Sequence, residues 1–367
     1  MKKLAFVTNI IPHYRETFYK KLMKKYVYIL ISSRHNTNDG RPALDRNILD
    51  NHIIVNDGGL SILGIDFIYQ KGAANYVKKF NPDIIIILGL SRFITNWILL
   101  FWGKLNKKKL VIWSSGWERI EKNNLLYKIK RLINFFYYNL ADYVLVYSTK
   151  GKEYLQPLLL NKNKIGVCLN GIEIDHLVKN ENEIKSKSSI LKEEYPGFKI
   201  FLYVGGMLRE KNVDLLINAF KELNKKYRNI ILWLVGDGPD IGYFESCAKE
   251  NEKIIFFGRK VDNVDEYFAA CDYFVLPGLG GLALNQAMFW GKPCIVSEAD
   301  GTEDDLVVNG ETGYRFIKNN PDSLLKVMEN SLLTDDSIYE SMSKKCSDII
   351  REISNVDNMV DTFFKIL

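Results

Sequence analysis

The sequence is poor in the residues that build metal and disulfide sites. Its 367 residues include only five cysteines and four histidines. The cysteines are scattered, odd in number and without the Cys-x-x-Cys spacing of zinc sites, which predicts reduced thiols in a cytosol and argues against a zinc site. The histidines stand far apart, so their spacing predicts no metal site. The positions are Cys168, Cys247, Cys271, Cys294 and Cys346, and His13, His35, His52 and His176.

Long apolar runs are missing as well, and no leader is expected. The chain enters a predicted strand at Leu4–Val7 directly, so we expect no signal peptide. The longest apolar stretch, residues 93–102, is interrupted and too short to cross a bilayer. A hydrophobic content of 47% with 26% charged residues is typical of a globular protein, and the length predicts two domains. We therefore expect a cytoplasmic protein.

Each half of the chain is dominated by charge of one sign. Residues 1–170 hold 27 Lys and Arg against 11 Asp and Glu, a net charge of +16, whereas residues 171–367 hold 23 against 33, a net charge of −10. Residues 91–109 and 123–140 are predicted basic helices that interleave cations with aromatic residues, as interfacial helices do. Core packing explains the aromatic residues equally well. The pattern favours an anionic membrane surface over nucleic acid as a partner, and with it peripheral association with the inner face of the cell membrane.

Residues 273–316 are the stretch around which the second half is organised. An apolar run at Tyr273–Leu276, a glycine-rich turn, a helical segment and a second apolar run together predict a strand–turn–helix–strand unit. Glycines let a ligand approach the backbone, and the N–H groups that open a helix favour an anion such as a diphosphate. A tight turn without a ligand is the alternative interpretation.

The same stretch resembles the donor-binding signature of glycosyltransferase family 4, which comprises retaining enzymes of the two-domain GT-B fold. The matching residues fall in order at the family's spacing: Gly281, Leu282, Ala287-Met288, Gly291, Pro293, Ile295, Gly310 and Thr312-Gly313. Pro277 matches as well if the loop after it is shorter than in the family. The family carries two Glu residues eight positions apart. Here Gly278 stands at the first of these positions and Gln286 at the second, so both carboxylates are replaced.

Residues 205–211 are similar to another family segment, Gly-Arg-Leu-x-x-x-Lys, in which Lys211 matches the Lys and Gly206 stands at the Arg position. The resemblance implies that Lys211 and Arg209 are the catalytic cations, because they would stabilise the leaving diphosphate. A solvated helix start is the alternative. The residues that the resemblance places at the donor are Gly205, Gly206, Asp237, Arg259, Gly280, Gly281, Leu282, Gln286, Glu303 and Asp305. One Glu of the family can be aligned with either of two residues here. Glu303 matches it by residue type, and Asp305 matches it by spacing.

The loop after the first predicted strand carries His13, Tyr14 and Arg15. Such a loop lies at the carboxyl edge of the sheet, where open α/β sheets bind ligands, and an Arg there can pair with a phosphate. Ser115 and Trp117 stand near the position of a family histidine. We predict that these five residues line the acceptor side, with a solvated loop as the alternative for the first three.

These patterns and the resemblance lead to one set of expectations. The fold class is α/β, with two Rossmann-like domains whose parallel sheets face a central cleft. Residues 1–170 form an acceptor-binding domain, residues 171–350 a donor-binding domain, and residues 351–367 a helix that crosses back to the first domain. The resemblance implies retaining transfer of a sugar from a nucleotide diphosphate donor to a hydroxyl of a glycan or lipid-linked acceptor, in surface polysaccharide or glycoconjugate synthesis, without a metal or other cofactor. The alternative is a weakly active sugar-nucleotide-binding subunit that has lost its carboxylates.

Overall fold

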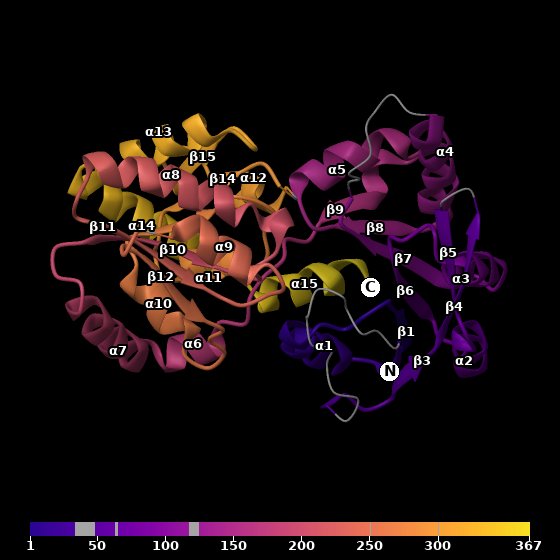
Figure 1. The fold of residues 1–367 in the computed structure, drawn as a ribbon. Coiled ribbons are helices and arrows are strands. Elements are labelled where there is room, and N and C mark those ends of the chain that lie inside the picture. Colours follow the sequence, from indigo (N-terminus) through magenta and orange to yellow (C-terminus); the bar gives the residue numbers. More distant parts are fainter. Residues whose placement is uncertain (34–47, 63–64, 117–124, 250, 300) are drawn as a thin grey trace. The chain divides into compact units, whose positions relative to one another are not determined.

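The computed structural model describes residues 1–33, 48–62, 65–116, 125–249, 251–299 and 301–367. The chain divides into two compact units (Figure 1). Unit 1 consists of Met1–Leu169 together with Met359–Leu367, and unit 2 consists of Asn170–Asn358. The C-terminal segment that we expected as one piece is therefore divided, with residues 351–358 in unit 2 and residues 359–367 in unit 1.

Unit 1 is built on a seven-stranded parallel sheet in the order β3-β2-β1-β6-β7-β8-β9. Its strands are β1 Lys3–Val7, β2 Val27–Ser33, β3 His52–Val55, β6 Ile84–Leu88, β7 Lys109–Ser114, β8 Tyr143–Val146 and β9 Ile165–Val167. The central strands read as near-continuous apolar runs, such as IIIIL in β6, because helices cover both faces of the sheet. An antiparallel pair, β4 Asp57–Ile62 and β5 Ile65–Gln70, stands apart from this sheet.

Two sets of helices cover the sheet of unit 1. Helices α2 Ala73–Phe80, α3 Ile94–Leu105, α4 Leu125–Leu140 and α5 Thr149–Leu155 contribute to one hydrophobic cluster with the strands. Helix α1 Glu16–Met23 lies on the other face, with most of α15 Val356–Ile366. There the Phe363 ring packs 5.2 Å from that of Phe18 and 5.3 Å from that of Trp113, between centroids. The last residues of the chain thus complete the core of its first unit.

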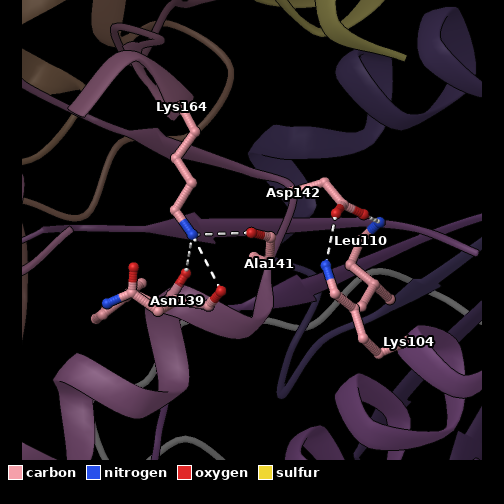
Figure 2. A network of polar contacts seen from close by, with 7 residues as sticks. Lys104, Leu110, Asn139, Ala141, Asp142 and Lys164 are labelled. Carbon is pink, nitrogen blue, oxygen red and sulfur yellow. Dashed lines mark hydrogen bonds and ion pairs between the residues drawn. The ribbon is translucent and has the colours of Figure 1, made fainter. Parts of the chain in front are cut away.

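A polar network ties α3, α4 and β7 together at one end (Figure 2). The Lys164 ammonium donates to the carbonyls of Tyr138, Asn139 and Ala141 at 2.9–3.2 Å. Asp142 accepts from the backbone N–H of Leu110 at 2.8 Å and pairs with Lys104 at 3.0 Å. A cation at the carbonyls that a helix leaves open at its C-terminus is favourable, so Lys164 caps α4.

Unit 2 contains a six-stranded parallel sheet in the order β12-β11-β10-β13-β14-β15. Its strands are β10 Lys199–Val204, β11 Ile230–Val235, β12 Ile254–Gly258, β13 Tyr273–Leu276, β14 Cys294–Ser297 and β15 Gly313–Phe316. The helices are α6 Asp175–Lys179, α7 Glu181–Glu193, α8 Val213–Lys226, α9 Ile241–Ala248, α10 Val264–Ala270, α11 Ala283–Phe289, α12 Thr302–Leu306, α13 Pro321–Leu332 and α14 Asp336–Glu352. Two hydrophobic clusters fill the two faces, one with α10, α11 and α14 and the other with α8, α9 and α13. The expected α/β class with two parallel sheets is confirmed.

The C-terminal region forms two helices rather than one continuous helix. Helix α14 ends at Glu352 and α15 begins at Val356. The Asn355 side chain causes the break, because its amide donates to the carbonyls of Ile350 and Arg351 while its oxygen accepts from the N–H of Asn358 at 3.0 Å. One side chain therefore caps the end of one helix and the start of the next.

Within the described ranges, no helix combines the length and the apolar character needed to cross a bilayer.

Candidate functional site

The sheet of unit 2 reverses its order at β10, which has β11 on one side and β13 on the other. In open parallel sheets, ligands bind outside the carboxyl ends of the strands at such a reversal. The loops concerned are residues 205–212 after β10 and residues 277–282 after β13. Gly205, Gly206, Lys211, Gly280, Gly281 and Leu282 all lie in these two loops. The fold therefore brings half of the predicted donor residues, together with Lys211, to one edge.

Lys211 joins the two loops. It ends a short 3-10 turn, Arg209–Lys211, and its ammonium donates to the carbonyl oxygens of Leu279 at 2.9 Å and Gly280 at 3.3 Å. Its backbone lies so close to Gly278 that a Cβ there would stand 2.6 Å from the Lys211 carbonyl oxygen. A side chain at position 278 would therefore push the two loops apart.

Arg209 lies beside Lys211 in sequence but has different partners. Its guanidinium carbon is 3.1 Å from the ring centroid of Tyr243, and its Nε is 3.7 Å from a carboxylate oxygen of Asp240. The backbone N–H of Arg209 also donates to Asp240 at 2.8 Å. The side chain remains largely exposed, so the aromatic ring and the carboxylate hold it toward α9. Asp240 and Tyr243 were not predicted, because neither belongs to a motif.

The loops after β11 and β12 reach the same edge of the sheet. Asp237 is exposed, and its carboxylate accepts from the N–H of Gly238 at 2.7 Å, which shapes the Gly-Asp-Gly-Pro turn. Arg259 follows β12 and is exposed. Their roles at a donor stay predictions.

The two carboxylates of α12 have different surroundings. Glu303 is buried and accepts from the backbone N–H groups of Ala299 and Gly301. Asp305 is half-buried on the same short helix. Glu303 thus holds the loop that leaves β14, and a donor contact of Glu303 or Asp305 stays a prediction.

Gln286 stands on α11, and its side chain turns toward α10. Its amide nitrogen is 3.1 Å from each carboxylate oxygen of Asp265, and the indole N–H of Trp290 donates to the same carboxylate at 2.7 Å. Burial raises the pKa of Asp265, while the hydrogen bonds from Trp290 and Gln286 and the charge of His176 act in the opposite direction. Sequence reasoning missed Asp265, because an acid in the first turn of a helix is ordinarily a solvated helix cap.

The predicted acceptor-side residues belong to unit 1. His13, Tyr14 and Arg15 form a 3-10 turn at the carboxyl edge, with β1 before it and α1 after it. The Arg15 guanidinium lies 4.5 Å from the ring centroid of Trp113 and 5.6 Å from that of Tyr147. Burial raises the pKa of the nearby Cys168 thiol to about 12, and the charge of Arg15 partly opposes this shift. The structure thus places His13, Tyr14 and Arg15 together in one turn at the carboxyl edge of the sheet.

The remaining acceptor-side predictions concern the end of β7. Ser115 is exposed directly after this strand. Trp117 lies outside the described residues. Within the described part of the chain, no group of His, Cys, Asp and Glu is arranged to hold a metal ion.

Comparisons with known proteins give a consistent result. The family model described as glycosyl transferases group 1 matches residues 184–349. An uncharacterized glycosyltransferase of Methanocaldococcus jannaschii is 30% identical over 311 residues, which cover 79% of this chain and 76% of the relative. A capsular polysaccharide biosynthesis glycosyltransferase of Staphylococcus aureus is 23% identical over 332 residues, which cover 83% of this chain and 81% of the relative.

The fold has close counterparts among solved structures. Anabaena HepE in complex with UDP superposes with a TM-score of 0.75 at 14% sequence identity, covering 100% of this chain and 99% of HepE. This likeness supports the expected GT-B architecture. The identity and coverage shared with the archaeal relative, together with the matching family model, show that the chain is a glycosyltransferase and belongs to the family of group 1 glycosyl transferases.

Proposed function

We propose that the protein is a retaining glycosyltransferase of family 4 in which both signature Glu residues are replaced. It moves a sugar from a nucleotide diphosphate donor to a hydroxyl of a glycan or lipid-linked acceptor, in the synthesis of a surface polysaccharide or glycoconjugate. The solved counterpart with bound UDP supports the class of donor. The relative named for capsular polysaccharide biosynthesis supports the class of product.

The position of Lys211 carries this proposal. Its ammonium stands at the reversal point of the unit 2 sheet, within 2.9 Å of the glycine-rich loop after β13. When the bond from sugar to diphosphate breaks, negative charge develops on the diphosphate oxygens, and a fixed cation stabilises that charge. The backbone at Gly280 and Gly281 carries no side chain that would keep the diphosphate away.

The other residues take the roles that the resemblance implies. Arg209 supports the same diphosphate, after turning from Asp240. Gln286 accepts a hydrogen bond from a ribose hydroxyl, and Asp237, Arg259 and either Glu303 or Asp305 complete the donor site. The donor's own phosphate takes the proton of the acceptor hydroxyl, so the proposed reaction uses no resident cofactor. The acceptor side is formed by His13, Tyr14, Arg15, Ser115 and Trp117.

A donor panel tests the proposal. Purified protein is incubated with UDP- and GDP-linked sugars and a lipid extract as acceptor, and nucleoside diphosphate release is compared with and without extract. Acceptor-dependent release with one donor, and a product whose anomeric configuration by NMR equals that of the donor, is the expected result. Binding of a nucleotide sugar without release from any donor would instead favour the inactive partner subunit. Inversion at the anomeric carbon would contradict the retaining mechanism.

The proposed partner surface lies on α3 and α4. Both helices pack on the same face of the unit 1 sheet and contact each other through the rings of Trp97 and Tyr137, whose centroids are 5.2 Å apart. On their outer sides they expose large apolar side chains, with exposed fractions of 53% for Phe101, 85% for Leu105, 58% for Leu132 and 56% for Phe136. Core packing, the alternative explanation from the sequence, does not account for these four side chains.

Cations accompany this apolar surface. A hollow of about 370 Å³ is lined by Lys104, Lys107, Lys108, Lys109 and Asp142, beside the last turn of α3. Four ammonium groups against one carboxylate make this hollow favourable for phosphate oxygens. Apolar side chains that enter the acyl boundary and cations at the headgroups together fit an anionic bilayer. We therefore propose that unit 1 binds the cytoplasmic face of an anionic membrane through α3 and α4, with no nucleic acid partner.

Vesicle co-sedimentation tests this surface. The protein should sediment with phosphatidylglycerol-containing vesicles at low salt, much less with phosphatidylcholine alone, and less as salt screens the lysines. Replacing Phe101 and Leu105 by Ser should abolish sedimentation. The matched control replaces Val308 and Leu333 by Ser, two exposed apolar residues of unit 2, and should leave it unchanged. Absence of binding at low salt, or equal loss in both variants, would contradict the proposed surface.

A further inference from the structure

The contact between Gln286 and Asp265 determines how the Gln286 amide points. Both oxygens of a carboxylate accept hydrogen bonds and neither donates. With its nitrogen 3.1 Å from both oxygens of Asp265, Gln286 is held with its NH2 group toward the carboxylate. The opposite orientation would place two acceptors against each other. The Gln286 carbonyl oxygen consequently points away from Asp265.

The carbonyl oxygen of Gln286 remains available to a ligand. Among the described residues, no hydrogen bond to this oxygen is formed. The side chain is half-buried, so the oxygen is not sealed in the core. It stands on the helix that follows the glycine-rich loop, where the resemblance places a carboxylate that accepts from ribose. Because the NH2 group is bound to Asp265, the amide presents only its acceptor oxygen to a ligand. A carboxylate at this position would likewise present only acceptor oxygens.

Asp265 is itself held in place by a second donor. The indole N–H of Trp290, the residue directly after α11, donates to one of its oxygens at a distance of 2.7 Å. The carboxylate is half-buried in the first turn of α10, so its orientation is fixed by packing as well as by hydrogen bonds. Its neighbour Glu266 faces α7 instead, where its carboxylate is 3.9 Å from the ammonium of Lys187.

We propose that Asp265 is a positioning residue for the donor nucleotide: it locks the Gln286 amide so that the carbonyl oxygen accepts a ribose hydroxyl. The family carries a negative charge at position 286, next to the ligand. Here the charge lies behind Gln286, on Asp265, which contacts Gln286 and not the ligand. This inference rests on the proposed donor site.

The proposal reverses the effect expected for one substitution. From the sequence alone, Gln286→Glu would restore the family residue and be tolerated or tighten binding. In the structure it places a second carboxylate within hydrogen-bond distance of Asp265. Two carboxylates that share a site do not both stay ionised without cost, so the single variant should be impaired. The exchange variant Asp265→Asn/Gln286→Glu recreates the pair with carboxylate and amide swapped, and should recover.

Calorimetric titration with UDP and with GDP tests this inference. For the nucleotide that binds, Gln286→Glu should weaken affinity about tenfold and Asp265→Asn about threefold, whereas the exchange variant should lie within about twofold of wild type. Glu266→Gln is the matched control, because it removes the same charge from the adjacent position without touching Gln286, and should change affinity less than about twofold. Thermal unfolding without nucleotide should show the same order, with Gln286→Glu lowest and the exchange variant restored.

Three outcomes lead to different conclusions. If wild type binds a nucleotide and the exchange variant binds no better than Gln286→Glu, the positioning role of Asp265 is wrong while the donor site stands. If wild type binds neither nucleotide, the proposed donor site is wrong, and the ribose contact falls with it. The exchange variant could also recover the unfolding temperature of wild type without recovering its affinity. Asp265 would then be only a structural link between α10 and α11.

Discussion

Each unit places a cation in the loop that follows the strand at which its sheet reverses order. In unit 1 this cation is Arg15 after β1, and in unit 2 it is Lys211 after β10. Arg15 lies over the rings of Trp113 and Tyr147, whereas the Lys211 ammonium lies against backbone carbonyls of a glycine-rich loop. The same charge at the same point of the fold therefore has two different surroundings.

The surroundings of Arg15 and Lys211 indicate what each loop is suited to do. Aromatic rings attract a guanidinium and hold it by packing, which stabilises the unit but leaves few polar groups for a ligand. A loop of glycines leaves its N–H and C=O groups accessible, so a phosphate can approach both the backbone and the cation. We therefore expect the Arg15 side chain to contribute to stability and to the shape of the acceptor side, and the Lys211 side chain to contribute directly to the chemical step.

The largest effect is expected from Phe363→Ala. This ring is fully buried against Phe18 and Trp113, the residue on which Arg15 rests. Its removal should lower the free energy of unfolding by about 3–5 kcal/mol, measured by denaturant titration with tryptophan fluorescence. The neighbouring ring of Phe364 is only partly buried, so Phe364→Ala should cost clearly less. Equal losses would show that α15 adds no specific packing to unit 1.

Lys211→Ala should give the largest catalytic effect. Loss of one fixed cation at the leaving group should reduce kcat/KM by a factor corresponding to about 2–4 kcal/mol, with the unfolding temperature nearly unchanged. Lys221→Ala is the control, because Lys221 also donates to a backbone carbonyl, that of Cys247, away from the loops. Unchanged activity in folded Lys211→Ala would remove this residue from the site.

Arg209→Ala compares the contributions of the two cations of unit 2, Arg209 and Lys211. Because Asp240 and Tyr243 hold the guanidinium toward α9, its removal should cost less than that of Lys211, about 1.5 kcal/mol in kcat/KM. Steady-state kinetics of both variants with one donor decide the order. A larger loss for Arg209 than for Lys211 would mean that the roles of the two cations are reversed.

Arg15→Ala should have the smallest effect. Loss of its contacts with the two rings should lower stability by about 0.5–1 kcal/mol, read from the thermal unfolding midpoint. Activity should change less than in either unit 2 variant. A reduction in kcat/KM as large as that of Lys211→Ala, without a loss of stability, would place Arg15 in the reaction and break the contrast between the units.

The fold class was predictable from the sequence because its signals are local. The run Tyr273–Leu276 ends at Pro277, and the observed β13 has the same bounds. The break between α14 and α15 was not predictable, since it depends on hydrogen bonds that the Asn355 side chain forms in both directions. A helical periodicity that continues across such a residue contains no sign of the interruption.

The candidate site was predictable only for residues whose position is determined by the path of the backbone. Lys211 and the glycines lie in loops whose place follows from strand order. Asp265 was missed because it lies 21 positions from Gln286 in the chain and on a different helix, and no spacing rule links the two residues. The surroundings of Arg209 were missed for the same reason, since Tyr243 and Asp240 meet it only through tertiary packing.

The division of unit 1 between the two ends of the described chain has a consequence for biosynthesis. Residues 359–367 leave the ribosome after all of unit 2 has been made. Until then, Phe18 and Trp113 lack the ring of Phe363, and the Cys168 thiol lacks the Met359 carbonyl, 3.8 Å away in the folded protein. Domains made first generally fold first, but here the unit that is begun first is finished last. During synthesis, the apolar surface that Phe363 covers in the folded unit therefore stays exposed until residues 359–367 have been made.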